Sequence, residues 1–517
     1  MPDIVRRTRP GLIPKGWGHQ EAGAAANRQS AFRSLLLLLC SSLQLLLGPA
    51  GAEAAPPPIR NWESLVHPLQ KSARQVAVQA VSLADRRIVF EHQADQHLLP
   101  ASLLKVVTSF VALKRLGPYY HFTTEVFGQP GLKDGTLPGN IWIKGNGDPY
   151  LVPEKLYLLA QKIRETGVRR INGGIGVDNG YFQPVVERFC LDGLCDRPYN
   201  PVVCATALNF NTVSLLLRVS EATAASVPFE VFPHGDYVLL DNQVKAGVAD
   251  AETQERRIEA HPEGLSADGR ERIRLSGQIS ASSGEVVEVR VNANDPVSFL
   301  ARSLKTILGE MGVSVRGGVQ RVGTVPANAH KLAEYQSPPL KDILYGLNRY
   351  SNNFMAEMLL RALGAEEKGI PGSAEKGVAV VGETLAALGI AGSDLELAGG
   401  SGLSRQCRLT VRALTSVLVA AYHDPEIGPE FVASLATGGE EGTLRRRGKR
   451  LANPSRIRGK TGSLSDVVGF AGYVANVDGR IHAVVILLNQ VHQPTQAKAA
   501  IDGLLSQLAD ASGSGGQ

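Results

Sequence analysis

Cysteine is scarce in this chain, and neither sign of charge dominates it. Five cysteines in 517 residues cannot form a disulfide scaffold. With 54 basic and 49 acidic residues, the net charge of +5 gives no reason to expect nucleic acid as a partner. A composition of 44% hydrophobic and 20% charged residues is typical of a globular chain. At about 150 residues per domain, the length suggests roughly three domains.

The N-terminal segment has the pattern of an export signal. Arg28 and Arg33 precede a mostly apolar run from Leu35 to Leu47, and small residues follow up to Ala52-Glu53-Ala54. A basic flank, a short apolar run and an Ala-x-Ala site predict a secretory signal peptide over residues 1–54. The alternative is a membrane anchor that is retained, although the run is shorter than the roughly 20 residues of a span. We expect an exported protein with no permanent membrane span after cleavage.

Export changes the interpretation of the cysteines. Cys190, Cys195 and Cys204 lie close together, and two of the three can pair in an oxidising compartment. The sequence does not say which two. A zinc site needs a fourth ligand and no histidine lies nearby, so we predict no metal here. The function predicted below requires no organic cofactor either.

The order of predicted elements indicates an α/β (α+β) fold with a long insertion. An Asp478-Gly479 turn between two β-rich runs is a clear hairpin signal. The middle of the chain, about 130–335, contains short β-like runs and one helical segment. The densest basic run, Arg445 to Arg450, is interpreted as a solvated face. Two hairpins are predicted, one pairing 76–81 with 88–90 and the other pairing 467–477 with 481–488. One helix is predicted to begin at Pro100, and five more are predicted over 297–311, 340–363, 375–388, 410–422 and 496–508.

Three short motifs carry the chemistry. They are Ser102-Leu103-Leu104-Lys105, Ser351-Asn352-Asn353 and Lys460-Thr461-Gly462. Residues three apart share a helix face, so the Lys105 amine can lie beside the Ser102 hydroxyl. Lysine can activate a serine only if its pKa falls, through burial or through a nearby cation such as Lys460. A serine in the first helical turn also brings its backbone N–H near a developing oxyanion.

None of these motifs is specific alone. A second Ser-x-x-Lys, Ser373 to Lys376, follows Pro371-Gly372 and is interpreted as a helix cap. Ser-x-Asn and Lys-Thr-Gly each occur once, and each alone is compatible with a cap or a turn. All three motifs in this order, on suitable elements, favour one active site.

That order resembles the penicillin-binding serine acyltransferases. The interval of 249 residues from Ser102 to Ser351 is similar to that of the S13 peptidases, the D-alanyl-D-alanine carboxypeptidase/endopeptidase family, which carry two extra domains there. The resemblance implies a transpeptidase-like domain (55–130 and 335–512) with an antiparallel sheet flanked by helices. It also implies an inserted domain II (131–215 and 286–334), an inserted β domain III (216–285) and a flexible tail (513–517). The resemblance extends over about 60–508, and the further matching stretches are 100–102, 145–149, 208–213, 400–405 and 441–444.

The resemblance also implies roles for the site residues. Ser102 is the expected acylated nucleophile and Lys105 its base, while Ser351 relays protons to the leaving amine. Asn353 is expected to hold the substrate amide and orient Lys105, and Lys460 supplies positive potential. The expected substrate-binding residues are Thr461 for the terminal carboxylate, Gly462 for close approach of the substrate backbone, and the N–H of Ser463, with that of Ser102, for the oxyanion.

The sequence therefore predicts a periplasmic serine DD-carboxypeptidase that also cleaves D-Ala cross-links of peptidoglycan. Its expected partners are peptidoglycan stem peptides and β-lactam inhibitors. Two alternatives stay open: a β-lactamase or esterase with the same groups, and a wall-binding or assembly protein with a residual site. The sequence leaves open the balance of the two peptidase activities, the diamino acid of the stem peptide and the oligomeric state.

Overall fold

The structure is a computed structural model that describes residues 62–184, 197–218, 227–247, 258–280, 286–321 and 324–512. The predicted leader, the predicted tail, Cys190 and Cys195 lie outside the described residues. Within the described ranges, no helix is both long and apolar enough to cross a membrane.

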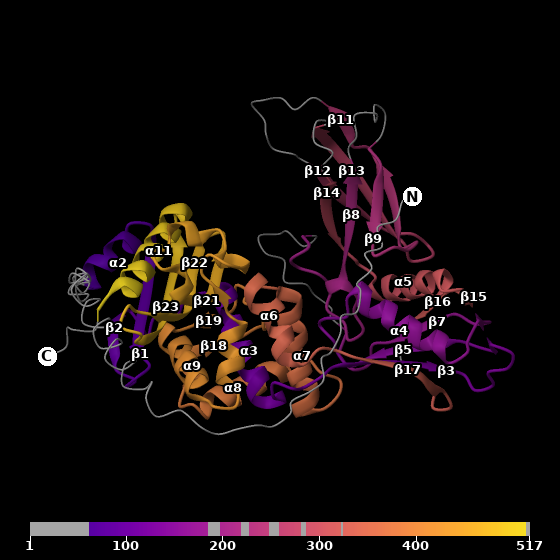
Figure 1. Cartoon of the computed structure of the whole chain (residues 1–517), viewed down its shortest axis with the longest axis horizontal. Coiled ribbons are helices and arrows are strands. Elements are labelled where there is room, and N and C mark those ends of the chain that lie inside the picture. The colour runs from indigo at the N-terminus through magenta and orange to yellow at the C-terminus, as the bar shows by residue number, and fades with distance from the viewer. Residues whose placement is uncertain are drawn as a thin grey trace, which may run out of the picture. The chain divides into compact units, whose positions relative to one another are not determined.

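A six-stranded sheet joins the two ends of the described chain (Figure 1). Every neighbouring pair in it is antiparallel. The hairpins predicted around residues 85 and 478 are both present in this sheet, so those predictions are confirmed. In spatial order the strands are β2 (Ile88–His92), β1 (Ala73–Ser82), β23 (Ile481–Val491), β22 (Val467–Ala475), β21 (Ile457–Leu464) and β20 (Ala436–Thr437).

Helices cover both faces of this sheet because its central strands are apolar on both sides. Successive strand residues point to opposite faces, so Val484 and Ile486 pack with one set of helices, and Val485 and Leu487 with the other. The first set is α2 (Trp62–Gln70) and α11 (Pro494–Asp510). The second includes α3 (Leu104–Leu116), α6 (Leu340–Tyr350), α7 (Asn353–Lys368), α8 (Ala374–Ala386), α9 (Val411–His423) and α10 (Gly428–Ser434), with the short pair β18 (Leu395–Glu396) and β19 (Arg408–Leu409) beside them.

The helix predicted over 340–363 is wrong as a single element. The chain breaks at Ser351, which adopts the left-handed conformation (φ 59°) and ends α6, and Asn352 then caps α7 through the Met355 N–H. Apolar residues recur at helical spacing on both sides of the break, so the hydrophobic period alone predicts one continuous helix. A non-glycine residue at positive φ gives little warning in sequence.

The basic run 445–450 is not one solvated face, because Arg447 is buried. Its Nε donates to Asp502 Oδ1 of α11 at 2.7 Å, and the Asp502 side chain is only 2% exposed. Arg450 donates to the other Asp502 oxygen at 3.1 Å, whereas Arg445 and Arg446 are exposed as predicted. The run therefore anchors the segment before β21 onto α11.

Replacing Asp502 by asparagine is expected to destabilise the protein by about 3–5 kcal/mol, because it leaves Arg447 charged and buried without its partner. Urea unfolding followed by circular dichroism measures this change. Asp510→Asn, at a more exposed position of the same helix, is the control and should change stability by less than about 1 kcal/mol. Equal effects of the two substitutions would contradict this assignment.

The inserted region contains a five-stranded mixed sheet with two helices packed on it. One of them, α5 (Pro296–Glu310), confirms the predicted helix 297–311, but α4 (Pro153–Glu165) was not predicted. Its buried residues Leu156, Leu159, Ala160 and Ile163 follow the helical period, and Pro153 starts it. The strands are β16 (Val319–Arg321), β7 (Ile175–Asp178), β5 (Ile141–Gly145), β3 (Thr123–Gly128) and β17 (His330–Gln336).

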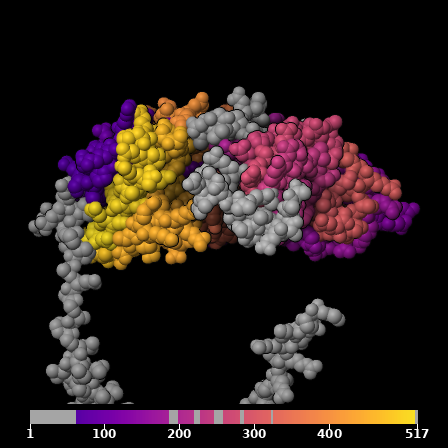
Figure 2. Space-filling model, turned by 90° about the horizontal axis from the view of Figure 1, so that it is seen from above, coloured from indigo at the N-terminus to yellow at the C-terminus, as the bar shows by residue number. Residues whose placement is uncertain are grey.

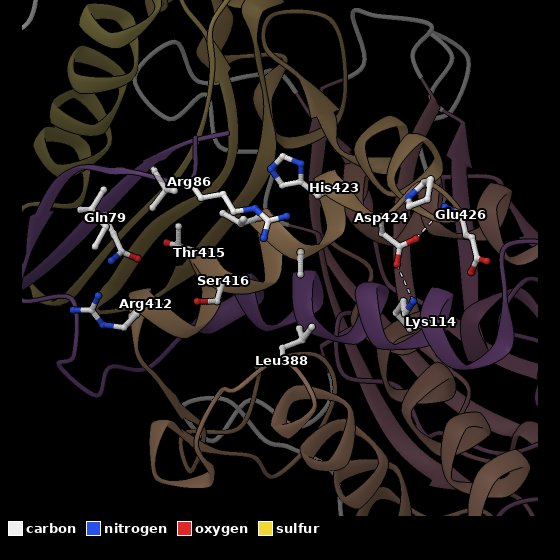
Figure 3. Close-up of a pocket in the computed structure, with 15 residues that line it drawn as sticks. Gln79, Arg86, Lys114, Leu388, Arg412, Thr415, Ser416, His423, Asp424 and Glu426 are labelled. Carbon is white, nitrogen blue, oxygen red and sulfur yellow. Dashed lines mark hydrogen bonds and ion pairs between the residues drawn. The ribbon is translucent and has the colours of Figure 1, made fainter. Parts of the chain in front are cut away.

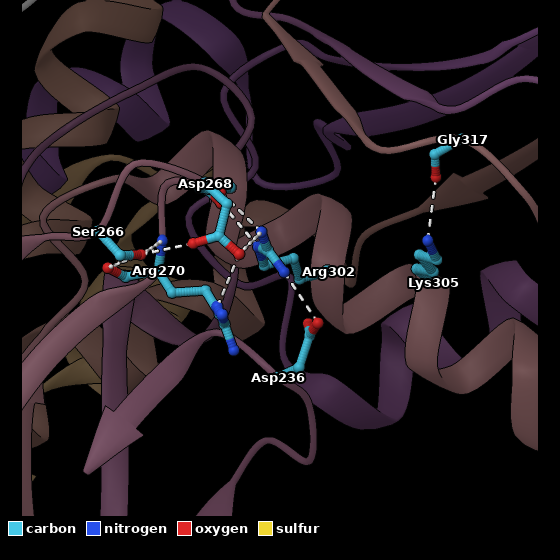
Figure 4. A network of polar contacts seen from close by, with 8 residues as sticks. Asp236, Ser266, Asp268, Arg270, Arg302, Lys305 and Gly317 are labelled. Carbon is cyan, nitrogen blue, oxygen red and sulfur yellow. Dashed lines mark hydrogen bonds and ion pairs between the residues drawn. The ribbon is translucent and has the colours of Figure 1, made fainter. Parts of the chain in front are cut away.

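Smaller sheets form the rest of the insertion, and a polar network ties some of their connections to α5 (Figure 4). Arg302 of α5 donates to Asp236 Oδ2 at 2.8 Å and to the Asp268 carbonyl at 2.6 Å, and Arg270 donates to Asp268 at 2.8 Å. The strands are β4 (Thr136–Leu137), β6 (Arg170–Ile171) and β15 (Ser314–Val315); β8 (Thr212–Arg218), β9 (Phe229–Phe232) and β14 (Val286–Asn292); and β10 (Val238–Asn242), β11 (Lys245–Gly247), β12 (Ile258–Leu265) and β13 (Glu271–Ser280).

Candidate active site

Ser102 lies in a 3₁₀ turn, Ala101–Leu103, that leads directly into α3, so the motif stands at a helix start as predicted. Lys105 is in the first turn of α3, and its Nζ donates to Ser102 Oγ at 3.0 Å. The segment at Gly402 (φ 76°) presses against this turn, since a Cβ on Gly402 would lie 1.8 Å from the Ala101 carbonyl oxygen. Only glycine fits there, and the contact holds the serine turn in place.

The Lys105 amine is fully buried and has three acceptors. Besides Ser102 Oγ, it donates to Asn353 Oδ1 at 2.7 Å and to the Ser401 carbonyl at 2.6 Å. Burial lowers the pKa of Lys105 to about 7, and the nearby Glu357 carboxylate opposes part of that shift. A large fraction of Lys105 is therefore uncharged near neutral pH.

Ser351 and Asn353 flank the break between α6 and α7 and reach the same centre. Ser351 Oγ accepts from Lys460 Nζ at 2.7 Å. Asn353 is the first residue of α7 and uses both ends of its amide: Oδ1 faces Lys105, and Nδ2 donates to the Tyr199 carbonyl at 2.9 Å. The left-handed backbone at Ser351 is the kind of local strain that is found at functional sites.

Lys460, Thr461 and Gly462 lie on β21. Lys460 is fully buried, and burial together with the neighbouring Lys105 holds its pKa well below the usual range. Thr461 Oγ1 donates to Thr443 Oγ1 at 2.8 Å. A Cβ on Gly462 would lie 3.1 Å from Leu103 Cγ, so this glycine also lets the strand approach the serine turn.

The outer edge of β21 is open beside these residues. β20 pairs only with Arg458 and Gly459, so within the described chain no strand covers the outer side of residues 460–464, which include the exposed Ser463. Such an edge can accept an extended peptide through backbone hydrogen bonds. The structure thus brings together all eight residues predicted for the site.

Several residues that contact the site had no predicted role. The Ser401 carbonyl, the Tyr199 carbonyl, Thr443 and Glu357 all contact or influence the predicted residues. Ser401 and Thr443 fall within matching stretches of the sequence, which pointed to the segment but not to the contact. Glu357 follows Asn353 by four residues on α7, and that spacing is the signal that could have identified it.

The second Ser-x-x-Lys behaves as a cap, as predicted. Ser373 Oγ accepts from the Lys376 backbone N–H at the start of α8, and Lys376 Nζ donates to the Gly369 and Pro371 carbonyls. The two copies of the motif therefore differ in burial and contacts, not in sequence pattern.

A pocket of about 840 Å³ lies elsewhere, between the β1–β2 hairpin and α9 (Figure 3). None of the predicted site residues lines it. Its Lys114 and Arg412 are paired with Asp424 and Asp95, so the charges at its two ends are largely neutralised.

No cluster of His, Cys, Asp or Glu in the described ranges is arranged to hold a metal ion. Cys204 and Cys407 are free thiols, and burial raises the pKa of Cys204 to about 12, so its thiol stays protonated. Cys190 and Cys195 lie outside the described residues, so their pairing stays open.

The site combines a serine hydroxyl beside a buried amine of lowered pKa, a second contact between a serine and a lysine, and an open strand edge. These are the groups that serine-based acyl transfer needs. The fold and these groups define a serine-type hydrolase. Comparison with known proteins agrees, since a model described as the D-Ala-D-Ala carboxypeptidase 3 (S13) family matches residues 63–508. The chain belongs to this family, and the fold class and family predicted from sequence are confirmed.

Individual relatives support the same assignment. A D-alanyl-D-alanine carboxypeptidase of Actinomadura sp. (strain R39) is 29% identical over 466 residues, covering 86% of this chain and 84% of that protein. The carboxypeptidase DacB of Haemophilus influenzae is 25% identical over 419 residues, covering 79% and 84%. The crystal structure of penicillin binding protein 4 from H. influenzae shares the fold, with a TM-score of 0.72 at 23% identity and coverage of 86% and 99%.

Proposed function

We propose that this carboxypeptidase cleaves the D-Ala-D-Ala bond through an acyl-enzyme on Ser102, with Lys105 as the base. The observation that carries the proposal is the 3.0 Å contact between Lys105 Nζ and Ser102 Oγ, made by an amine whose pKa burial lowers to about 7. A base that titrates near the working pH is well matched to proton transfer.

In the first step, the Ser102 hydroxyl proton passes to Lys105 Nζ as Oγ bonds to the carbonyl carbon of the penultimate D-Ala. The C–N bond then breaks, and the proton that Lys105 took from Ser102 passes through Ser351 to the leaving amine of the terminal D-Ala, which restores neutral Lys105. Lys460, which donates to Ser351 Oγ at 2.7 Å, supports this relay. Water then attacks the ester, the acyl group leaves as a carboxylic acid, and the Ser102 hydroxyl is restored.

The substrate peptide lies along the open edge of β21 in this proposal. Thr461, with Lys460 providing positive potential, binds the terminal carboxylate, and Asn353 holds the substrate amide. The backbone N–H groups of Ser102 and Ser463 stabilise the oxyanion. The absence of a paired strand beside 460–464 in the described chain supports this placement.

The same chemistry extends to D-Ala cross-links and to β-lactams, which we propose as a further substrate and as inhibitors. A structure of H. influenzae penicillin binding protein 4 complexed with a novel β-lactam has the same fold, with a TM-score of 0.68 at 23% identity. We also propose that residues 1–54 direct the chain to the periplasm, where these substrates lie. We further propose that the chain has the predicted domains, with β3 (Thr123–Gly128) belonging to the inserted region.

Digestion of purified peptidoglycan, followed by mass spectrometry of the fragments, tests this function. We expect release of terminal D-Ala from pentapeptide stems and conversion of cross-linked dimers to monomers. Neither product should form with Ser102→Ala. Failure of the wild-type chain to release D-Ala, or release by the Ser102→Ala variant at the wild-type rate, would refute the proposal.

A further inference from the structure

One face of α7 carries three polar side chains at intervals of four residues: Asn353, Glu357 and Arg361. Asn353 contacts Lys105, whereas Glu357 and Arg361 form an ion pair at 3.0 Å with side chains only 7% and 9% exposed. A buried ion pair adds little stability over apolar residues, because desolvation offsets the attraction. The role of this ion pair is therefore sought in the other contacts of Glu357.

Those contacts converge on residues 400 and 401. Glu357 Oε1 accepts hydrogen bonds from the N–H groups of Gly400 and Ser401, both at 3.0 Å, and from Ser401 Oγ at 2.8 Å. The carbonyls of the same two residues point the other way, toward α3: Gly400 O accepts from Thr108 Oγ1 at 2.7 Å, and Ser401 O accepts from Lys105 Nζ at 2.6 Å. The segment is thus held between the Glu357 carboxylate and the catalytic amine.

We propose that Glu357 is a positioning residue, which fixes the Gly400–Ser401 segment so that the Ser401 carbonyl and the Asn353 amide aim Lys105 Nζ at Ser102 Oγ. This inference rests on the proposed roles of Ser102 and Lys105. Glu357 itself has no contact with Ser102 among the hydrogen bonds of the described chain, and it acts through Ser401.

The proton count of the amine explains why two carbonyl acceptors matter. A neutral amine has two N–H groups and one lone pair. When Asn353 Oδ1 and Ser401 O accept the two N–H groups, the lone pair is directed at Ser102 Oγ. The Ser102 proton can then pass to Nζ, and the ammonium that forms donates to all three oxygens.

The charged groups around Lys105 fix the expected pH effect. Lys460 faces it from β21, and the Glu357 carboxylate, which is paired with Arg361, acts on it from α7. The Glu357 carboxylate raises the pKa of Lys105 against the larger effect of burial. Removing this carboxylate should therefore move the acid limb of the acylation profile to lower pH, as well as slowing the reaction.

The test measures the second-order rate of penicillin acylation in three variants. Glu357→Gln removes the charge, and Glu357→Gln with Arg361→Gln avoids leaving Arg361 unpaired. Ser401→Ala removes one of the three hydrogen bonds to Glu357, together with the acceptor of the Leu403 N–H, and leaves every charge in place. We expect the two Glu357 variants to acylate about 10- to 100-fold more slowly at the pH optimum, with the acid limb of Glu357→Gln shifted down. Ser401→Ala should lose about fivefold.

Asp502→Asn is the matched control, because it breaks a buried ion pair between α11 and Arg447 whose described hydrogen bonds include none to the predicted site residues. It should lower stability and leave the acylation rate of the folded protein unchanged. Wild-type rates in the folded double variant and in Ser401→Ala, together with an unshifted acid limb in folded Glu357→Gln, would overturn the role of Glu357. Absence of acylation in the wild type would instead refute the proposed function, so the two failures are distinguishable.

Discussion

Replacing Ser102 by alanine is expected to abolish penicillin acylation and D-Ala release, because Ser102 is the proposed nucleophile and its hydroxyl is the one that Lys105 contacts, whereas the Ser351 hydroxyl contacts Lys460. Lys105, Asn353 and the Ser401 carbonyl remain in place around the missing hydroxyl. Mass spectrometry of the intact protein after incubation with penicillin should show one adduct on the wild type and none on the variant.

Ser373→Ala is the matched control for this experiment, since Ser373 begins the second Ser-x-x-Lys of the chain. Its hydroxyl caps α8, so the variant should lose some stability and still take up one adduct. An adduct on Ser102→Ala, or its loss from a folded Ser373→Ala, would contradict the assignment of the nucleophile.

Lys105→Arg is expected to slow acylation by about 10²- to 10⁴-fold, the usual contribution of a general base. A guanidinium keeps its proton throughout the pH range in which proteins are stable, so it cannot accept the serine proton. Stopped-flow measurement with a chromogenic cephalosporin gives the rate directly.

Lys376→Arg provides the corresponding control. Lys376 occupies the same position in the second motif, but its Nζ donates to the Gly369 and Pro371 carbonyls, and only its backbone N–H contacts the Ser373 hydroxyl. Its rate should equal that of the wild type. A Lys105→Arg variant that acylates within about threefold of the wild type would exclude a base role for this amine.

Much of the catalytic fold follows from local patterns. The two hairpins have alternating or apolar strands, and α8, α9 and α11 have clear helical periods. The short helix α10 (Gly428–Ser434) was not predicted. The helix break at Ser351 was not predictable in this way, because the apolar period continues from Leu347 to Phe354 across a residue that is not glycine. The unpredicted α4 has a regular period, but a surrounding region of β-like runs obscured it.

The site residues were also predictable where local sequence determines them, but not where tertiary packing does. Each motif identifies its own residues, and the i, i+3 spacing of Ser102 and Lys105 predicts their contact. The contacts across the chain follow from tertiary packing: Lys460 with Ser351, and Lys105 with the Ser401 carbonyl. Backbone carbonyls carry no side-chain signature, so pattern alone could not assign roles to Ser401 and Tyr199.

The most direct measurement is the pH dependence of the penicillin acylation rate. With the pKa of Lys105 lowered to about 7, the base is protonated and inactive at lower pH and free at higher pH. The rate should therefore rise with pH, reach half its maximum near pH 7 and level off above it. A rate that is flat across this range, or that still rises toward the value of about 10.4 typical of an exposed lysine, would contradict the account.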